Sequence, residues 1–181
     1  MCIRDRDLAE ACEFKVNTGL RDEEVCQLKW AWEHEVVGYG ISIFIIPGGM
    51  VKNAEDRLVI LNQVAKSIVD QRRGNNSDWV FPSPRTGKPR YNLNNSCWQR
   101  SWRRAGLPVS GQWTRGVHNL KHTFGRRLRA AGVVFEDRQV LLGHTNGSIT
   151  THYSGPEILN LIEAANKVCQ MRPEAVLRRV V

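Results

Sequence analysis

The sequence predicts an α+β fold that is mainly α, with a small antiparallel β-sheet near residues 32–61. Apolar residues recur at helical spacing before and after that segment. Within it, β-branched residues dominate, and glycine and proline separate them into short runs. The length of 181 residues is enough for one domain with a sizeable core. We therefore expect an uncertain N-terminal segment over 1–6, one domain over 7–171 and a C-terminal tail over 172–181.

The expected elements follow from these patterns in chain order. A helix over 7–16 stops before Gly19, and acidic residues open a short helix after Arg21. Trp98 and Trp102 lie four positions apart on a later helix, which favours burial of both in the core. Further helices are expected over 62–72 and 93–105, from 117 onward, and over 137–142 and 156–169; strands are expected over 35–37, 41–46, 51–52 and 57–60.

Charge, hydropathy and cysteine spacing restrict the class of protein. A net charge of +8 attracts polyanions, although a merely basic surface would give the same value. No apolar run approaches the roughly 20 residues that cross a bilayer, so no membrane partner is expected. The five cysteines are scattered without a C-x-x-C motif, which argues against a disulfide framework or a zinc knuckle and favours the reducing cytoplasm.

Candidate site residues concentrate between Val117 and Ser154. His118 and Lys121 lie about one helical turn apart, Leu142-Gly143-His144 ends the next helix, and Tyr153 is a candidate nucleophile. Proton-transfer groups, positive charge and a nucleophile in one segment favour the chemistry of phosphodiester bonds. Upstream, Arg21 is placed equally well in such a site or in a salt bridge with Glu24.

The ordered motifs resemble the catalytic domain of the tyrosine recombinase (phage integrase) family. The resemblance covers nearly the whole chain, from about residue 7 to about residue 171. It departs from the family at Lys121, where arginine is usual, because lysine keeps the charge but lacks the planar fork that holds two phosphate oxygens. The resemblance rests on Thr18-Gly19-Leu20-Arg21 with Glu24, Lys52 at a β-turn, His118-x-x-Lys121, Leu142-Gly143-His144 and Tyr153.

The resemblance implies a helical domain of tyrosine recombinase type that cleaves and rejoins DNA through a 3′-phosphotyrosine, with neither cofactor nor metal. Tyr153 would attack the phosphate, and Lys52 would protonate the departing 5′ oxygen. Cations and a hydrogen-bond donor would stabilise the charge on the phosphate, and a neutral imidazole would take the tyrosine proton. The expected catalytic set is Arg21, Lys52, His118, Lys121, His144 and Tyr153, with Glu24 supporting Arg21.

Double-stranded DNA is the expected partner, and two basic segments are candidates to contact it. A loop carries Arg85, Lys88 and Arg90, and a helix carries Arg100, Arg103 and Arg104. The apolar stripe of the last helix either packs on its own domain or, as in integrases, docks on a neighbouring protomer within a tetramer. Family members normally also have an N-terminal helical domain that clamps the DNA, so we expect this chain to be a fragment.

Two other classes stay open at this point. A catalytically impaired DNA-binding module derived from an integrase would use the same basic surface, with Lys121 leaving the site inert. A metal hydrolase could be built from His118, His122 and His144, although Asn119 stands where such a motif usually has glutamate.

Overall fold

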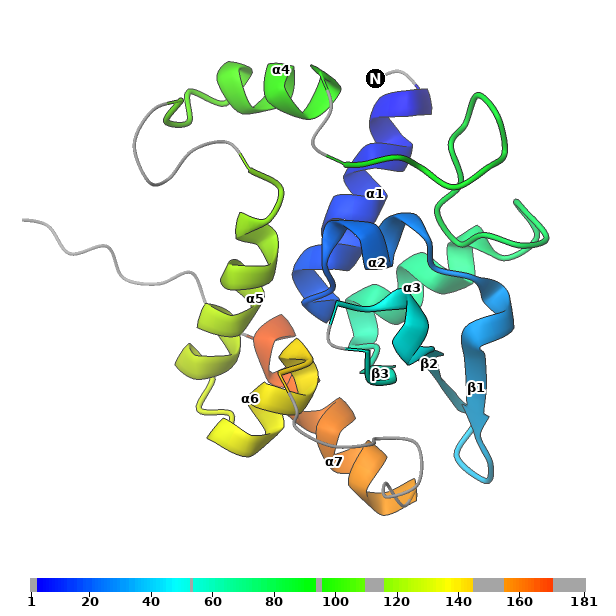
Figure 1. Ribbon diagram of the computed structural model, residues 1–181. Coiled ribbons are helices and arrows are strands. Elements are labelled where there is room, and N and C mark those ends of the chain that lie inside the picture. Colours follow the sequence, from blue (N-terminus) through cyan, green and yellow to red (C-terminus); the bar gives the residue numbers. More distant parts are fainter. Residues whose placement is uncertain (1–2, 53, 94–95, 110–115, 145–154, 171–181) are drawn as a thin grey trace, which may run out of the picture.

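The computed structural model describes residues 3–52, 54–93, 96–109, 116–144 and 155–170. It is mainly helical with one three-stranded antiparallel sheet, which confirms the predicted fold class (Figure 1). The helices are α1 (Ile3–Thr18), α2 (Asp22–Cys26), α3 (Gln63–Arg72), α4 (Ser96–Arg104), α5 (Asn119–Ala130), α6 (Phe135–Leu142) and α7 (Gly155–Asn166); the strands are β1 (Glu33–Val36), β2 (Ile41–Ile46) and β3 (Arg57–Val59); the 3-10 turns are η1 (Trp30–Trp32), η2 (Gly48–Met50) and η3 (Lys167–Cys169).

The sheet has the order β1-β2-β3, with Val36 opposite Ile41 and Phe44 opposite Val59. The strand expected over 51–52 is wrong. Pro47 and two glycines turn the chain into η2 instead, and the backbone N–H of Val51 donates to the carbonyl of Gly48 at 3.1 Å. This turn places the following segment in the connection between β2 and β3, outside the sheet.

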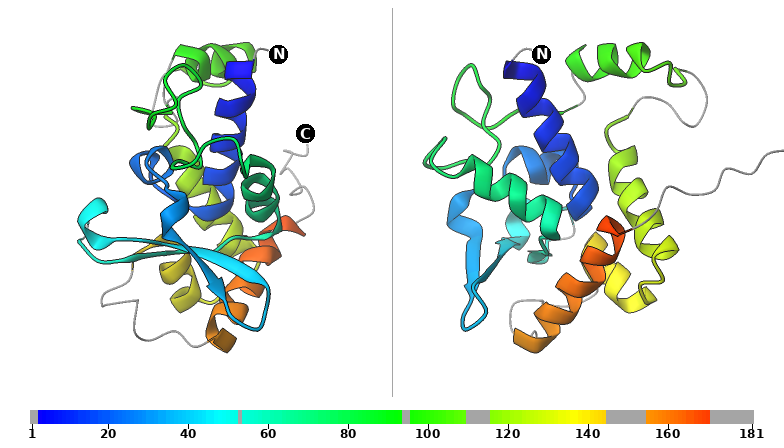
Figure 2. Two further views of the ribbon diagram at one scale, coloured as in Figure 1. Left: turned by 90° about the vertical axis from the view of Figure 1, so that its right-hand side faces the viewer. Right: turned by 180° about the vertical axis from the view of Figure 1, so that it is seen from behind.

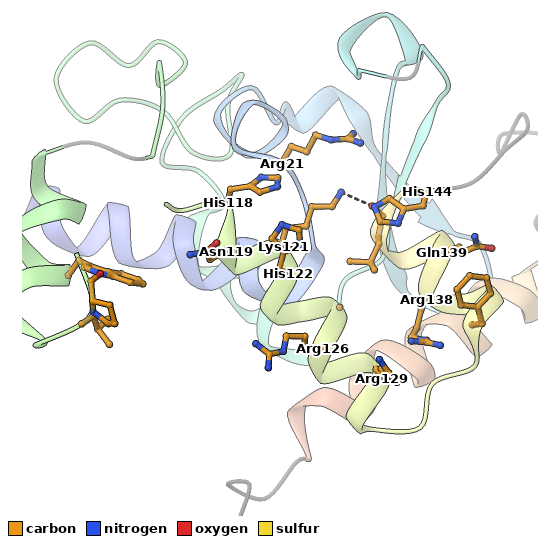
Figure 3. A pocket seen from close by; sticks show the side chains of 16 residues that line it. Arg21, His118, Asn119, Lys121, His122, Arg126, Arg129, Arg138, Gln139 and His144 are labelled. Atoms are coloured by element: carbon orange, nitrogen blue, oxygen red, sulfur yellow. Dashed lines mark hydrogen bonds between the residues drawn. The ribbon is translucent and has the colours of Figure 1, made fainter. Parts of the chain in front are cut away.

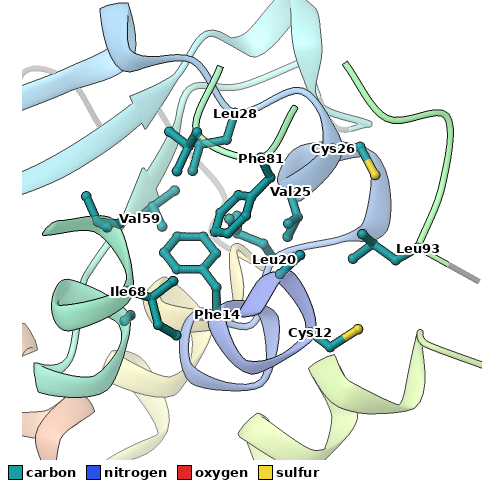
Figure 4. Packing of buried hydrophobic residues seen from close by; sticks show 14 of the residues in the cluster. Cys12, Phe14, Leu20, Val25, Cys26, Leu28, Val59, Ile68, Phe81 and Leu93 are labelled. Atoms are coloured by element: carbon teal, nitrogen blue, oxygen red, sulfur yellow. The ribbon is translucent and has the colours of Figure 1, made fainter. Parts of the chain in front are cut away.

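Two hydrophobic clusters form the core. The first surrounds Phe14 of α1, whose ring lies 4.9 Å from that of Phe81 between centroids (Figure 4). The second lies among the sheet, α5, α6 and α7, with Phe124 and Leu128 fully buried. Leu120 of α5 packs against the first cluster, so this one helix joins the two. In both views of Figure 2, α5 lies beside the long helix α1, with which it is in contact.

The apolar stripe of α7 is covered within its own chain. Leu161 and Ala165 of α7, and Val168 of η3 just after it, are buried in the second cluster together with residues of α5 and α6. Of the two expectations for this stripe, packing on the same domain is the one that the structure bears out. Within the described residues, no helix is long and apolar enough to cross a membrane.

The helix α4 differs from the expectation of a buried aromatic face, because none of its residues is buried. Trp98 and Trp102 instead pack mainly on each other, with ring centroids 5.8 Å apart, and Trp98 reaches only the edge of the first cluster. The indole N–H of Trp102 donates to the carbonyl of Pro108 at 2.7 Å. The two tryptophans therefore lie at the margin of the core, and Arg100, Arg103 and Arg104 of this helix are exposed.

The helix α1 is longer than predicted at both ends, since it begins at Ile3 and ends at Thr18. It stops at Gly19, which has a φ of +67° in the left-handed region that favours glycine. A Cβ at this position would lie 2.7 Å from Cδ1 of Phe124 and 3.2 Å from Cδ2 of Leu142. Gly19 thus packs directly against α5 and α6 at the end of α1, just before Arg21.

Replacing Gly19 with alanine should lower the free energy of unfolding in urea by about 2–4 kcal/mol, the sum of left-handed strain and overpacking against Phe124. The matched control is Gly74→Ala, which has a similar φ of +79° but no heavy atom of the described residues within 4 Å of its Cβ. The control should lose only about 1–2 kcal/mol. Equal losses in the two variants would contradict the close packing at Gly19.

Candidate active site

Arg21 is fixed at the start of α2 by a reciprocal pair of contacts with Glu24. The backbone N–H of Arg21 donates to Oε2 of Glu24 at 2.7 Å, and its Nη1 donates to Oε1 at 2.8 Å. Glu24 is only 3% exposed, whereas Arg21 is half-buried with its guanidinium at the pocket edge. The salt bridge considered from the sequence is present, and its geometry fixes the direction in which Arg21 projects.

The beginning of α5 supplies two further groups. His118 caps the helix and is exposed, while Lys121 follows one turn later and is 5% exposed. The ammonium Nζ of Lys121 donates to the carbonyl of Leu142 at 2.7 Å (Figure 3). Lys121 therefore crosses from α5 to the end of α6 and faces the same space as His118.

His144 stands just beyond α6 because Gly143 ends that helix in the left-handed conformation, with φ +64°. The N–H of His144 donates to the carbonyl of Gln139 at 2.9 Å, and that of Gly143 donates to Val140 at 2.9 Å. These two bonds form a Schellman turn. The expectation that Gly143 ends the helix and leaves His144 just beyond it is confirmed.

The surroundings lower the pKa of His118, His144 and Lys121. Partial burial and the charges of His122 and Lys15 lower the pKa of His118, and partial burial with nearby cations lowers that of His144. Burial, reinforced by the charges of Arg57 and Arg21, lowers the pKa of Lys121 to about 7. Both imidazoles are therefore neutral at pH 7, and Lys121 is close to its midpoint.

These residues line one pocket of about 980 Å³ (Figure 3). His118, Lys121 and His144 point toward the end of it where Arg21 lies. Along the rest of the pocket the wall becomes basic and apolar, and among its described lining residues there is no Asp or Glu. This extension is lined by Arg126, Arg129 and Arg138 and by Trp102, Leu107 and Phe135. The charge balance suits a polyanion.

The structure brings four of the six predicted catalytic residues together. Lys52 is exposed in the connection between β2 and β3 and is not among the residues lining the pocket. Tyr153 lies outside the described residues. Among the predicted DNA contacts, Arg85 and Lys88 are exposed and Arg90 is half-buried.

Three residues near the site were not singled out from the sequence as members of it. Lys15 of α1 is fully buried and forms an ion pair with Asp22 beside Arg21. His122 packs its ring edge-on to His118 at 4.8 Å between centroids. Arg57, discussed below, is a buried arginine at the first position of β3, and only the fold reveals its burial. Among the residues that the structure describes, no three His, Cys, Asp or Glu side chains are grouped to hold a metal ion.

Glu24→Gln should lower the free energy of unfolding at pH 7 by about 2 kcal/mol, the usual value of buried hydrogen bonds to a charged group. Burial alone would raise the pKa of Glu24, but the charge of Arg57 and the hydrogen bonds from Arg21 outweigh it and leave the pKa lowered. A lowered carboxyl pKa stabilises the fold above the unfolded pKa, near 4.5, and this stabilisation is lost as the pH falls through the folded value. In urea titrations this loss of unfolding free energy should therefore shrink between pH 5 and pH 3. The matched control is Glu23→Gln, whose side chain is exposed, and it should lose less than about 0.5 kcal/mol at pH 7.

Comparison with known proteins agrees with this fold. The sequence model of the phage integrase family matches residues 2–157, so the chain belongs to that family. Tyrosine recombinase XerA of Pyrococcus horikoshii is 28% identical over 155 residues, which are 82% of this chain and 50% of that protein. The integrase of Salmonella phage P22 is 25% identical over 173 residues, which are 89% of this chain and 42% of that protein. The chain spans about half the length of these relatives.

Two solved structures share the fold. XerH site-specific recombinase, bound to difH substrate in a pre-cleavage complex, aligns with a TM-score of 0.61 and 21% identity, over 95% of this chain and 49% of that chain. The Tn1549 transposon integrase in complex with circular intermediate DNA aligns with a TM-score of 0.52 and 17% identity, over 86% of this chain and 57% of that chain. The recombinase type of helical domain expected from the sequence motifs is thereby confirmed.

Proposed function

We propose that this chain is the catalytic domain of a site-specific DNA recombinase or integrase, which cleaves and rejoins strands through a 3′-phosphotyrosine. The observation that carries the proposal is the convergence of Arg21, His118, Lys121 and His144, from three separate segments, on one basic pocket. The proposed partner is double-stranded DNA, in line with the difH substrate bound to XerH and the circular intermediate DNA bound to the Tn1549 integrase. We place the protein in the cytoplasm.

In the proposed cleavage step the hydroxyl oxygen of Tyr153 attacks phosphorus, and the bond from phosphorus to the 5′ oxygen breaks. His118 takes the tyrosine proton, a role supported by the lowered pKa that keeps its imidazole neutral. Lys52 gives a proton to the departing 5′ oxygen. The tyrosine phosphodiester conserves the bond energy, so a 5′ hydroxyl of another strand can reverse the step without a nucleotide cofactor or a metal.

Positive charge and hydrogen-bond donors would act on the nonbridging oxygens as negative charge develops there. Arg21 presents a guanidinium whose direction Glu24 fixes, and Lys121 presents an ammonium from the opposite wall. His144, as a neutral imidazole, can donate a hydrogen bond without adding charge. Groups held in advance in this way lower the barrier, since they need little reorganisation during the reaction.

We further propose that the active form is a tetramer on DNA that joins two duplexes. The apolar stripe of α7 is already covered by its own core, so contacts between protomers would use other surfaces of that helix or other elements. The extended basic wall of the pocket, together with Arg85, Lys88, Arg90 and the arginines of α4, is the proposed contact with the DNA backbone.

The test uses nicked suicide duplexes tiled across the DNA that flanks the gene, incubated with the full chain in EDTA. A nick beside the scissile phosphate lets the short product strand diffuse away, so the covalent intermediate accumulates as a shifted band on a denaturing gel. We expect an adduct on one duplex and not on its neighbours. Binding without any adduct would overturn the proposal in favour of the inactive DNA-binding module, and cleavage that leaves no adduct and appears only when a divalent metal replaces the EDTA would favour a hydrolase.

A further inference from the structure

Arg57 is a buried charge in the wall behind the pocket. It is the first residue of β3 and is 3% exposed, although the other two residues of that strand, Leu58 and Val59, are apolar. Burial lowers the pKa of Arg57 to about 10, so it remains charged at neutral pH. A buried guanidinium is costly unless it is paired and hydrogen-bonded, which directs attention to its partners.

The partners of Arg57 are the last carbonyls of α6. Its Nη1 donates to Val140 and its Nη2 to Leu141, each at 2.7 Å. The next carbonyl, of Leu142, accepts from Lys121 at 2.7 Å. The last carbonyls of a helix have no acceptor role within it and carry the negative end of its dipole, so two cations at this end satisfy and neutralise it.

The same guanidinium fills the space beside the turn that leads to His144. A Cβ on Gly143 would lie 2.6 Å from Cζ, Nε and Nη1 of Arg57. The backbone of Gly143 is therefore packed directly on the plane of the arginine. Because His144 follows immediately, the place of its imidazole depends on this contact.

Arg57 also acts on the other wall of the pocket through Glu24. Burial raises the pKa of Glu24. Among the effects that lower it, the charge of Arg57 is the largest. Glu24 in turn holds both the backbone N–H and the guanidinium of Arg21. Arg57 thus contacts the segment that presents His144 and acts electrostatically on the carboxylate that holds Arg21.

We propose that Arg57 is a positioning residue for strand cleavage: its planar fork on the carbonyls of Val140 and Leu141 holds the end of α6, and hence His144, in register with Arg21. The inference rests on the proposed function. Arg57 does not reach DNA, because it is buried, and it acts through the residues that do.

The main variant is Arg57→Met, measured by single-turnover cleavage of the suicide duplex at saturating DNA. We expect the rate to fall roughly 10²-fold or more, the scale of misplacing transition-state donors, while half-saturation by DNA changes less than about threefold. Arg57→Lys keeps the charge but replaces the fork with one point donor, so its rate should fall about tenfold. Each variant is assayed at a temperature where circular dichroism shows it folded.

The matched control is Arg72→Met. Arg72 is also buried, at 5% exposure, and also donates to a carbonyl, from Nε to Val80 at 2.6 Å, but it lies in α3 away from the pocket. It should lose stability as Arg57→Met does and keep its cleavage rate within about threefold. A rate for Arg57→Met within threefold of the wild type, or an equal fall in Arg72→Met, would overturn the proposal. If Arg57→Met does not fold, the cleavage rates of Arg57→Lys and Arg72→Lys are compared instead, with the same criteria.

Two readouts separate positioning from general destabilisation. The charge of Arg57 helps to lower the pKa of Lys121, so the alkaline limb of the cleavage profile should move to higher pH in Arg57→Met and stay in place in Arg72→Met. Native-state hydrogen exchange at the amides of Gly143 and His144 should accelerate at least tenfold in Arg57→Met, and less at the amide of Phe124 in mid-helix. The exchange measurement needs no DNA, so the two proposals can fail separately. A wild type that does not cleave would overturn the proposed function. Unchanged exchange at Gly143 and His144 in Arg57→Met would overturn the role of Arg57.

Discussion

Tyr153→Phe is expected to abolish the covalent adduct with the suicide duplex, lowering the cleavage rate by roughly 10⁵-fold or more. The reason is that phenylalanine lacks the oxygen that would form the bond to phosphorus, and the loss of a covalent nucleophile has effects of this scale. DNA affinity, measured by gel shift, should change less than about threefold because the surrounding cations remain. Adduct is quantified on a denaturing gel over several hours.

Tyr91→Phe is the matched control. Tyr91 is 95% exposed on the segment before α4, so removal of its hydroxyl should leave adduct formation unchanged. Mass spectrometry of the digested wild-type adduct should locate the nucleotide on the peptide that contains Tyr153. Adduct formed at full rate by Tyr153→Phe, or a nucleotide on another tyrosine, would remove Tyr153 from the role proposed here.

Lys121→Ala is expected to reduce cleavage by roughly 10²-fold or more, the scale of losing one transition-state donor. The ammonium of Lys121 donates to the carbonyl of Leu142 at 2.7 Å and faces the pocket, whereas the neighbouring cation Arg57 is buried behind the pocket wall. Lys121→Arg should preserve or raise the rate, because guanidinium supplies the same charge in a planar fork. Single-turnover cleavage with excess protein measures both.

The pH dependence of cleavage should distinguish these two variants further. The pKa of Lys121 is lowered to about 7, so in the free protein its charge is present below pH 7 and is lost as the pH rises through 7. At low DNA concentration the wild-type rate should therefore fall about tenfold per pH unit above 7. Arginine stays protonated, so Lys121→Arg should lose this alkaline limb. The acid limb, below pH 6.5, comes from protonation of His118, whose pKa is lowered, and should be the same in both.

Lys66→Ala is the control for a lost lysine, since Lys66 pairs with Asp70 on α3, outside the pocket. Its rate and pH profile should match those of the wild type. Wild-type activity in Lys121→Ala would remove Lys121 from the site. An alkaline limb that persists in Lys121→Arg would assign that limb to another group.

The sequence predicted most of the helices because their signals are local. The apolar spacing of α3 and α5, and the glycines that end α1 and α6, act within a few residues. The structure has these helices and helix ends where the sequence predicted them. The strand expected over 51–52 failed because two glycines favoured a turn over the β-propensity of Val51. The unpredicted first turn of α1 is polar, so the helical period gave no sign of it.

The site was predicted where motifs identify single side chains, and missed where tertiary contacts decide. Arg21 and His144 follow from recognisable short motifs, and their meeting at one pocket required the fold. Arg57 stands between two polar residues and an apolar run, so its sequence context suggests an ordinary strand start. Its role depends on carbonyls more than eighty residues away, which no local pattern encodes.

The position of α5 between the two hydrophobic clusters has a consequence for how mutations affect this member of the phage integrase family. Any shift of one cluster against the other would carry His118 and Lys121 away from Arg21, because the helix that holds them is anchored on both sides. The geometry of the candidate site then depends on how the hydrophobic core packs, more than on the loops around the pocket. Substitutions remote from DNA, such as a shortened side chain at Phe14 or Leu161, can slow the chemistry while every reactive group is intact.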